Sequence, residues 1–192
     1  MTVAFSTSSP WTSVALLDDG GEVKWSGRRN APMAASGACL GLLEEMSAST
    51  GITLESVDIF AADIGPGSFT GVRVGVTIAK TFGYLYGKPV AGAPSFDLIA
   101  ADTTVVMPSK KGEFFVRRVG CDPVRSVTLP EEYYQGFGPG VEDPRWPDAA
   151  GFAPLLEDIK PVAAMSFEPA YLIEPSISIP NKPFPKQRQV GG

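Results

Sequence analysis

Short apolar runs alternate with turn residues at the start of the chain. Apolar and β-branched residues occupy positions 3–5 and 12–17, and positions 22–25 form a third short run. The second and third runs are separated by Asp18-Asp19-Gly20-Gly21. Asp-Gly and Gly-Gly pairs accept the positive φ angles of tight hairpin turns. The pattern therefore predicts three antiparallel strands over residues 3–25.

Two longer segments have helical spacing and flank a buried strand. The first is expected to run from Pro32 to about residue 50 and to stop at Gly51. The second is expected over residues 69–86, with Ser68 as its N-cap and Lys88-Pro89 beyond its end. The apolar run at 57–64 predicts a strand that leads into the second helix.

Small residues recur at every fourth position of the second predicted helix: Gly71, Gly75, Ala79, Gly83 and Gly87. Residues four apart lie on one face of a helix, so this face allows another backbone to come very close. The first half of the first helix is also thin, because it holds Ala34, Gly37, Ala38 and Gly41. Two interpretations stay open: the stripe packs inside its own domain, or it forms an interface with another chain.

The remainder of the chain has a different pattern. Strands are expected at 103–107 and 113–119, after a strand that begins at Val90 and a short helix over 95–101. A loop rich in Gly and Pro follows at 136–147, and a helix is expected over 149–158. We predict a first subdomain at 1–92, a smaller α+β subdomain at 93–174, and a Pro-rich basic tail at 175–192.

Composition and charge exclude several classes of protein. The chain of 192 residues has 44% hydrophobic residues, enough for a packed core, and a net charge of −5. An acidic protein is a poor candidate for binding nucleic acid alone, because phosphate contacts need clustered positive charge. No apolar run is long enough to span a membrane, and no signal peptide is expected. With only two cysteines, a reduced, cytoplasmic protein is the simplest interpretation.

The sequence contains no histidine. This excludes a Ser-His-Asp or Cys-His nucleophile system and any imidazole metal site. A catalytic role would have to use carboxylates, Lys, Ser, Thr or Tyr.

The glycine-rich loop between the buried strand and the second helix is the main candidate site. It comprises Gly65, Pro66, Gly67, Ser68, Phe69, Thr70 and Gly71, with Arg73 one turn into the helix. A strand, a glycine loop and a helix N-terminus can bind an anion. The loop lacks the Lys-Ser/Thr ending of a phosphate-binding P-loop, however, so a tight turn capped by Ser68 is the favoured interpretation. Asp63, just before the loop, is the better functional carboxylate, although it has no evident partner.

Other charged residues give weaker signals. The acidic pairs Asp18-Asp19 and Glu44-Glu45 lack the additional oxygen ligands of a metal site, so we expect none. Lys110-Lys111 and Arg117-Arg118 flank one predicted hairpin. They favour a solvated surface, with RNA contact inside a larger complex as the alternative.

The order of these motifs resembles a known family. The resemblance is carried by Phe5-Ser6-Thr7-Ser8, by the block from Gly65 to Gly75, by Gly112-Glu113-Phe114, by Trp146-Pro147-Asp148, and by Glu168-Pro169-Ala170-Tyr171-Leu172. Together they span nearly the whole chain and are similar to the TsaB (YeaZ) family of bacteria, the glycoprotease-like proteins. The resemblance implies an α/β actin-like ATPase (ASKHA, ribonuclease H-like) fold with two mixed-sheet subdomains, here with a degenerate and shortened second one.

The resemblance also implies a function without chemistry of its own. Members bind a TsaD-like catalytic subunit, and a TsaE-like ATPase joins them to make threonylcarbamoyladenosine at position 37 of tRNA. The family member is a scaffold and activator that often forms homodimers, reaches tRNA only through the complex, and leaves ATP and metal to its partners. The interface expected from the small stripe and the first helix comprises Ala34, Ala38, Leu42, Met46, Gly71, Gly75, Ala79 and Gly83.

The chain departs from the family pattern at two places. Ser6 stands where relatives commonly have an Asp that helps to hold a nucleotide's metal in active members of the fold, and Ala35 lies near the place of a common histidine. These departures weaken the hypothesis of a nucleotide-binding module. A peptidase that acts on the paralogous subunit, through a Ser-Lys pair, is the other alternative.

Overall fold

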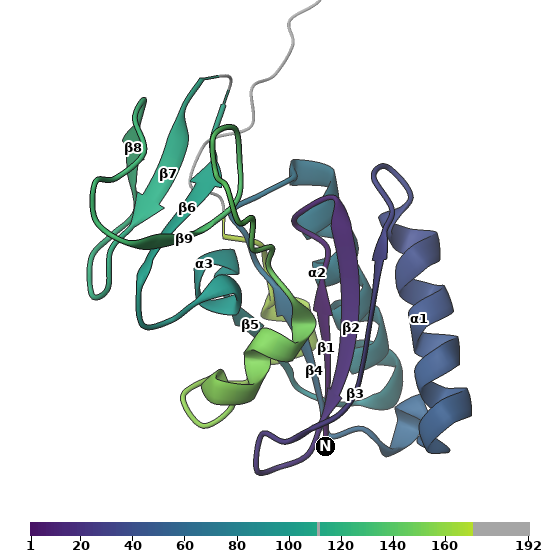
Figure 1. The fold of residues 1–192 in the computed structure, drawn as a ribbon. Helices are drawn as coiled ribbons and strands as arrows, with labels where there is room; N and C mark the ends of the chain where they lie inside the picture. Colours follow the sequence, from purple (N-terminus) through teal and green to yellow (C-terminus); the bar gives the residue numbers. More distant parts are fainter. Residues whose placement is uncertain (111, 171–192) are drawn as a thin grey trace, which may run out of the picture.

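A computed structural model describes residues 1–110 and 112–170 of the chain. Its elements form two sheets with separate hydrophobic clusters (Figure 1). The predicted tail at 175–192 and Lys111 lie outside the described residues. Among the residues that are described, no helix is long and apolar enough to cross a membrane.

The first sheet has the strand order β3-β2-β1-β4-β5. Its strands are β1 (Thr2–Ser6), β2 (Trp11–Leu17), β3 (Val23–Asn30), β4 (Ile59–Asp63) and β5 (Val90–Ala93). β1, β2 and β3 are antiparallel neighbours, as their turn chemistry predicts, while β4 and β5 continue the sheet in parallel with β1. Parallel neighbours need a crossover connection, and α2 provides the one between β4 and β5.

Helices α1 (Ala35–Thr50) and α2 (Phe69–Tyr86) cover one face of this sheet. Both end at a glycine in the left-handed conformation, Gly51 and Gly87, as expected of helix C-caps. The first helix begins three residues later than Pro32, because Met33 has a φ of 65° and interrupts helical geometry. A short 3₁₀ turn, η1 (Leu54–Ser56), leads from α1 toward β4.

The second sheet has the order β8-β7-β6-β9. It contains β6 (Thr104–Pro108), β7 (Phe114–Arg117), β8 (Val124–Ser126) and β9 (Tyr134–Gly136), and the short α3 (Ser95–Ile99) precedes it. Phe96 of α3 packs in one cluster with Val105, Met107 and Phe137. The two sheets of mixed direction agree with the expected actin-like ATPase fold.

Residues 149–170 return to the first sheet, although the sequence pattern placed them in the second subdomain. The expected helix at 149–158 is a 3₁₀ segment, η2 (Ala149–Leu155), which contains Pro154. Its Phe152 is fully buried against the face of the first sheet opposite α1 and α2 (Figure 1). Val162 then forms a bridge with Val90 at the free edge of β5, and η3 (Ala164–Ser166) contacts α2.

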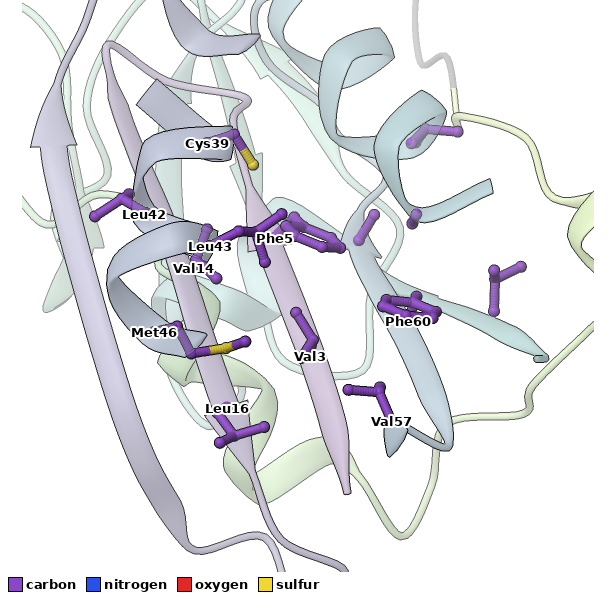
Figure 2. Close-up of a cluster of buried hydrophobic side chains, with 14 of the residues drawn as sticks. Val3, Phe5, Val14, Leu16, Cys39, Leu42, Leu43, Met46, Val57 and Phe60 are labelled. Carbon is purple, nitrogen blue, oxygen red and sulfur yellow. The ribbon is translucent and has the colours of Figure 1, made fainter. Parts of the chain in front are cut away.

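The largest cluster of apolar side chains lies between α1, α2 and the first sheet. Leu42 and Met46 of α1 belong to one buried cluster with Val3, Val14 and Leu16 of the sheet (Figure 2). Burying one such side chain contributes about 1.5–3 kcal/mol. These two residues therefore stabilise the fold of the chain itself.

The small stripe on α2 faces inward, which corrects the interface prediction. Gly71, Gly75, Ala79 and Gly83 are buried against this chain's own elements. A Cβ atom added at Gly75 would lie 2.6 Å from Oγ1 of Thr7, and one at Gly83 would lie 2.6 Å from Cγ1 of Val90. Of the two interpretations that the stripe left open, close packing within the domain is the one that the structure supports.

The same correction applies to the first helix. Ala38, Leu42 and Met46 are buried in the core, so none of them can meet another chain unless the fold opens. Ala34 alone among the predicted interface residues is exposed, just before α1. The periodicity correctly identified which residues share a face of each helix. These faces pack against the chain's own sheet and not against another chain.

We predict that Gly71→Ala will destabilise the chain by about 1–3 kcal/mol, the usual cost of overpacking a well-packed site. The added Cβ would overlap the carbonyl oxygen of Thr7. Gly37→Ala is the matched control, because Gly37 lies in α1 with no atom within 4 Å of its added Cβ. The control should stabilise the chain by up to about 1 kcal/mol. Urea unfolding of both variants measures the difference, and equal midpoints would contradict the close-packing assignment.

Candidate functional site

The glycine loop is a tight turn between β4 and α2. Gly65 has a φ of 93°, in the region that favours glycine. The backbone N–H of Ser68 donates to the carbonyl oxygen of Ser8 at 2.7 Å, and Oγ of Ser68 accepts from the N–H of Gly71 at 3.2 Å. The structure thus confirms Ser68 as the N-cap and joins the loop to the segment that follows β1.

Thr7 holds the first turn of α2 against the end of β1. Its hydroxyl donates to the carbonyl oxygen of Gly71 at 2.7 Å and accepts from the N–H of Gly75 at 3.1 Å. Only glycine leaves room for Thr7 beside the helix, since a Cβ at Gly71 would meet the Thr7 carbonyl oxygen and one at Gly75 would meet the Thr7 hydroxyl. The backbone and the hydroxyl of one residue therefore explain two glycines of the stripe.

Asp63 lies beneath the loop and is fully buried. Its Oδ2 is hydrogen-bonded to the hydroxyls of Ser6 at 2.8 Å and Ser8 at 2.5 Å. Its Oδ1 accepts from the N–H of Gly65 at 2.9 Å and lies 2.5 Å from Oγ of Ser95. Burial raises the pKa of the Asp63 carboxyl above its usual range, although these hydrogen bonds act in the opposite direction.

The partners of Asp63 come from three segments that the sequence analysis did not connect. Ser6 ends β1, Ser8 lies in the following turn, and Ser95 begins α3. The contact between Ser6 and Asp63 follows from strand register. β1 pairs in parallel with β4, and the pairing of Phe5 with Ala62 places Ser6 beside Asp63. The position of Ser95 depends on the path of the chain after β5, and no local pattern indicated it.

A pocket of about 640 Å³ opens above this cluster. Its walls come from the turn after β1, the segment before α1, the glycine loop with the start of α2, and the ends of β6 and β9. The lining residues with a hydroxyl are Thr7, Ser8, Ser9, Ser36, Ser68, Thr70 and Ser109. Of the described residues that line the pocket, none carries a charge. Ser6 does not belong to this lining, and its hydroxyl is hydrogen-bonded to Asp63.

The pocket therefore has hydroxyl and backbone groups but no carboxylate to hold a nucleotide's metal. Within residues 1–110 and 112–170, no group of three or more Cys, Asp or Glu side chains is placed to bind a metal ion. The thiol of Cys39 is no nucleophile, since burial raises its pKa to about 12. The chemistry that this arrangement supports is binding by neutral hydrogen bonds.

The other charged candidates are engaged locally. The guanidinium of Arg73 lies 4.0 Å from the ring centre of Phe69. Arg117, expected at the surface, is buried and pairs with Asp97 at 2.9 Å. Arg117 is therefore not available for contact with RNA. Arg118 forms an ion pair with Glu132.

The outward side of α1 and α2 carries exposed apolar side chains. We call this the helical surface; its most exposed apolar members are Leu40, Phe69, Tyr84 and Leu85. Tyr84 is 73% exposed and Leu85 is 64% exposed. Exposed apolar side chains on two neighbouring helices are candidates for contact with a protein partner.

Comparison with known proteins identifies relatives of the chain. A model of the family described as "TsaD: tRNA N6-adenosine threonylcarbamoyltransferase" matches residues 32–113. An uncharacterized protein of Mycobacterium tuberculosis is 36% identical over 84 residues, which make up 42% of this chain and 39% of the relative. The tRNA threonylcarbamoyladenosine biosynthesis protein TsaB of Haemophilus influenzae is 32% identical over 133 residues, 65% of this chain and 56% of that protein. The match thus spans about two fifths of the mycobacterial relative and just over half of the second.

Solved structures agree with the fold. YeaZ from Pseudomonas aeruginosa superposes with a TM-score of 0.70 at 21% identity, over 89% of this chain and 99% of that one. A further Pseudomonas aeruginosa protein, described as similar to the peptidase YEAZ, gives a TM-score of 0.77 at 20% identity, over 90% and 99% of the two chains. The solved structures agree with the fold of this chain, and the names of the matched relatives agree with the family resemblance that the sequence indicated.

We expect Thr7→Val to destabilise the chain by about 1–3 kcal/mol, because the bonds to Gly71 and Gly75 are lost in a buried place. Thr7→Ser keeps the hydroxyl and removes one methyl group, so it should cost only about 0.8 kcal/mol. Chemical unfolding of the two variants gives the comparison. A serine variant that is less stable than the valine variant would show that the methyl group, and not the hydroxyl, holds α2 in place.

Proposed function

We propose, from the resemblance of this chain to the TsaB (YeaZ) family in sequence and fold, that it takes part in the biosynthesis of threonylcarbamoyladenosine in tRNA. Relatives in Haemophilus influenzae and Bacillus subtilis carry that function in their names. In this proposal the chain acts in the cytoplasm as a non-catalytic subunit. It binds and activates a TsaD-like catalytic subunit, a TsaE-like ATPase joins them, and tRNA is reached through the complex.

The observation that carries the non-catalytic role is the uncharged lining of the pocket. Transfer of a carbamoyl or phosphoryl group develops negative charge, which enzymes stabilise with cations, metals or strong donors. The residues around this pocket that the structure describes offer hydroxyl groups and no charged side chain. ATP and metal are therefore assigned to the partner subunits, and no cofactor is assigned to this chain.

Most of the residues that the sequence suggested for partner binding are buried within this chain, so other residues of α1 and α2 must make the contact. The stripe and the core side chains of α1 are buried, so the helical surface is the part of these helices that a partner can reach. We assign to it both the contact with the TsaD-like subunit and the homodimer that forms in its absence. Competition between the two contacts for one surface is a consequence of this assignment.

Leu40→Arg should weaken binding to the TsaD-like subunit at least tenfold without changing the stability of the chain. Leu40 is 47% exposed, so the variant places a charge where the proposal puts an apolar contact. Val127→Arg is the matched control, because Val127 is exposed beyond β8 and away from α1 and α2. Size-exclusion chromatography with light scattering, on each variant mixed with the TsaD-like subunit of the same cell, measures the complex.

The same variants test the biological role. Cells depleted of this chain and supplied with Leu40→Arg should hold less threonylcarbamoyladenosine in their tRNA than cells supplied with wild type or Val127→Arg. Mass spectrometry of digested tRNA gives the amount. A normal amount of the nucleoside after depletion would reject the proposed function, whereas a loss that both variants rescue equally would reject only the helical surface.

ATP with magnesium should leave the melting temperature of the isolated chain unchanged. The pocket provides no carboxylate for the metal and no cation for the phosphates among its lining residues. A ligand present at 100 times its dissociation constant would stabilise the folded state by about 2.7 kcal/mol, which a thermal melt detects readily. A clear rise in melting temperature would favour the nucleotide-binding alternative.

A further inference from the structure

The buried cluster around the Asp63 carboxyl holds more hydrogen-bonding contacts than it has protons if Asp63 is ionised. Five contacts converge: Ser6, Ser8, Ser95 and Gly65 each contact Asp63, and Oγ of Ser95 lies 3.1 Å from Oγ of Ser8. Each hydroxyl carries one proton and the Gly65 amide carries one. An ionised carboxylate donates none, so only four protons would be available for five contacts.

We propose that Asp63 is a neutral carboxylic acid at neutral pH, and that its proton completes a closed ring of hydrogen bonds with Ser95 and Ser8. In this ring, Oδ1 of Asp63 donates to Ser95, Ser95 donates to Ser8, and Ser8 donates back to Oδ2 of Asp63. Ser6 and the Gly65 amide donate to the remaining lone pairs. Every contact then has one proton.

The surroundings of Asp63 favour the neutral form. Its hydrogen-bond partners are three hydroxyls and one amide, and its side chain is fully buried. β1 and β5 carry no titratable side chain. On α3, Asp97 pairs with Arg117, and on α2 the first charged residue, Arg73, is exposed over Phe69. Hydrogen bonds from hydroxyls and one amide replace the hydration of a carboxylate here, and burial still raises the pKa of Asp63 above its usual range.

The ring connects the core to the pocket. Ser8 lines the pocket, Gly65 begins the glycine loop, and Ser95 also donates its backbone N–H to the carbonyl oxygen of Gly65 at 2.9 Å. The proton on Asp63 thus sets the direction in which the Ser95 hydroxyl points: this hydroxyl donates to Ser8 when Asp63 is protonated and to Asp63 when the carboxyl is ionised. Asp63 is a positioning residue for the pocket wall, and this conclusion does not depend on the proposed function.

Asp63→Asn separates the neutral and ionised alternatives. If Asp63 is neutral when folded and ionised when unfolded, the folded state holds one more proton than the unfolded state. The unfolding equilibrium constant of wild type should then rise by up to about tenfold per pH unit above pH ~4, the pKa of an unfolded Asp, until the pH reaches the folded pKa. Asparagine is neutral at every pH, so the variant should lose this part of the pH dependence and be at least as stable as wild type at pH 7.

Urea unfolding at several pH values between 5 and 8 measures the effect. Glu44→Gln is the control, because it removes one exposed carboxylate and should keep the pH dependence of wild type. A variant Asp63→Asn that is less stable at pH 7 and keeps the wild-type slope would overturn the proposal, because an ionised carboxylate predicts that result.

A second measurement detects the proton on Asp63 directly in the wild-type chain, so it does not depend on the folding of a variant. Infrared spectroscopy of the wild-type chain labelled with ¹³C at the aspartate carboxyls should show the carbonyl stretch of a protonated acid at pH 7. Exposed aspartates are ionised at that pH and give only carboxylate bands. A spectrum without the acid band at pH 7 would reject the neutral Asp63.

Discussion

The close approach of α2 to the end of β1 is the constraint on which the rest of the structure depends. The helix begins directly beside Thr7, and two glycines one turn apart leave room for the carbonyl group and the hydroxyl of that residue. The approach positions the glycine loop over the end of β4 and brings Ser68 to the backbone of Ser8. The wall of the pocket, the capping of α2 and the burial of Asp63 all follow from this one contact.

The polar groups of the site therefore lie in two places, on the pocket surface and beneath the glycine loop. The described part of the pocket surface carries hydroxyls and no charge, while the carboxyl group of Asp63 lies beneath the loop and is engaged by serines. Ser6, at the end of β1, is one of these serines. In this chain the buried polar groups hold the loop against the strands.

The two sheets are joined from both ends of the second one. α3 leads into the second sheet and packs Phe96 in its core, while residues 149–170 return to the first sheet with Phe152 and Val162. The pocket lies where these parts meet, because Pro108 and Phe137 of the second sheet face the glycine loop across it. Its shape therefore depends on contacts made far from its walls.

Much of this architecture could be predicted from sequence, because local signals carry it. The Asp18–Gly21 turn specified the antiparallel start, Ser68 and Lys88-Pro89 marked the ends of α2, and the motif order indicated the family. The 3.6-residue period also identified which residues share a face of α2. Helical periodicity indicates which side chains share a face but not what that face contacts. A stripe of small residues packed inside the domain therefore has the same sequence pattern as one at an interface.

Only the tertiary structure decided what those faces and the lone carboxylate meet. Gly71 and Gly75 contact Thr7, which is more than 60 residues away in the chain, and Asp63 meets Ser6 and Ser95 through strand pairing and a crossover. Local sequence determines which elements form, since propensity, caps and turns act over a few residues. Burial and hydrogen-bond partners depend on how distant elements pack, and that is why Asp63 gained its partners only in the folded chain.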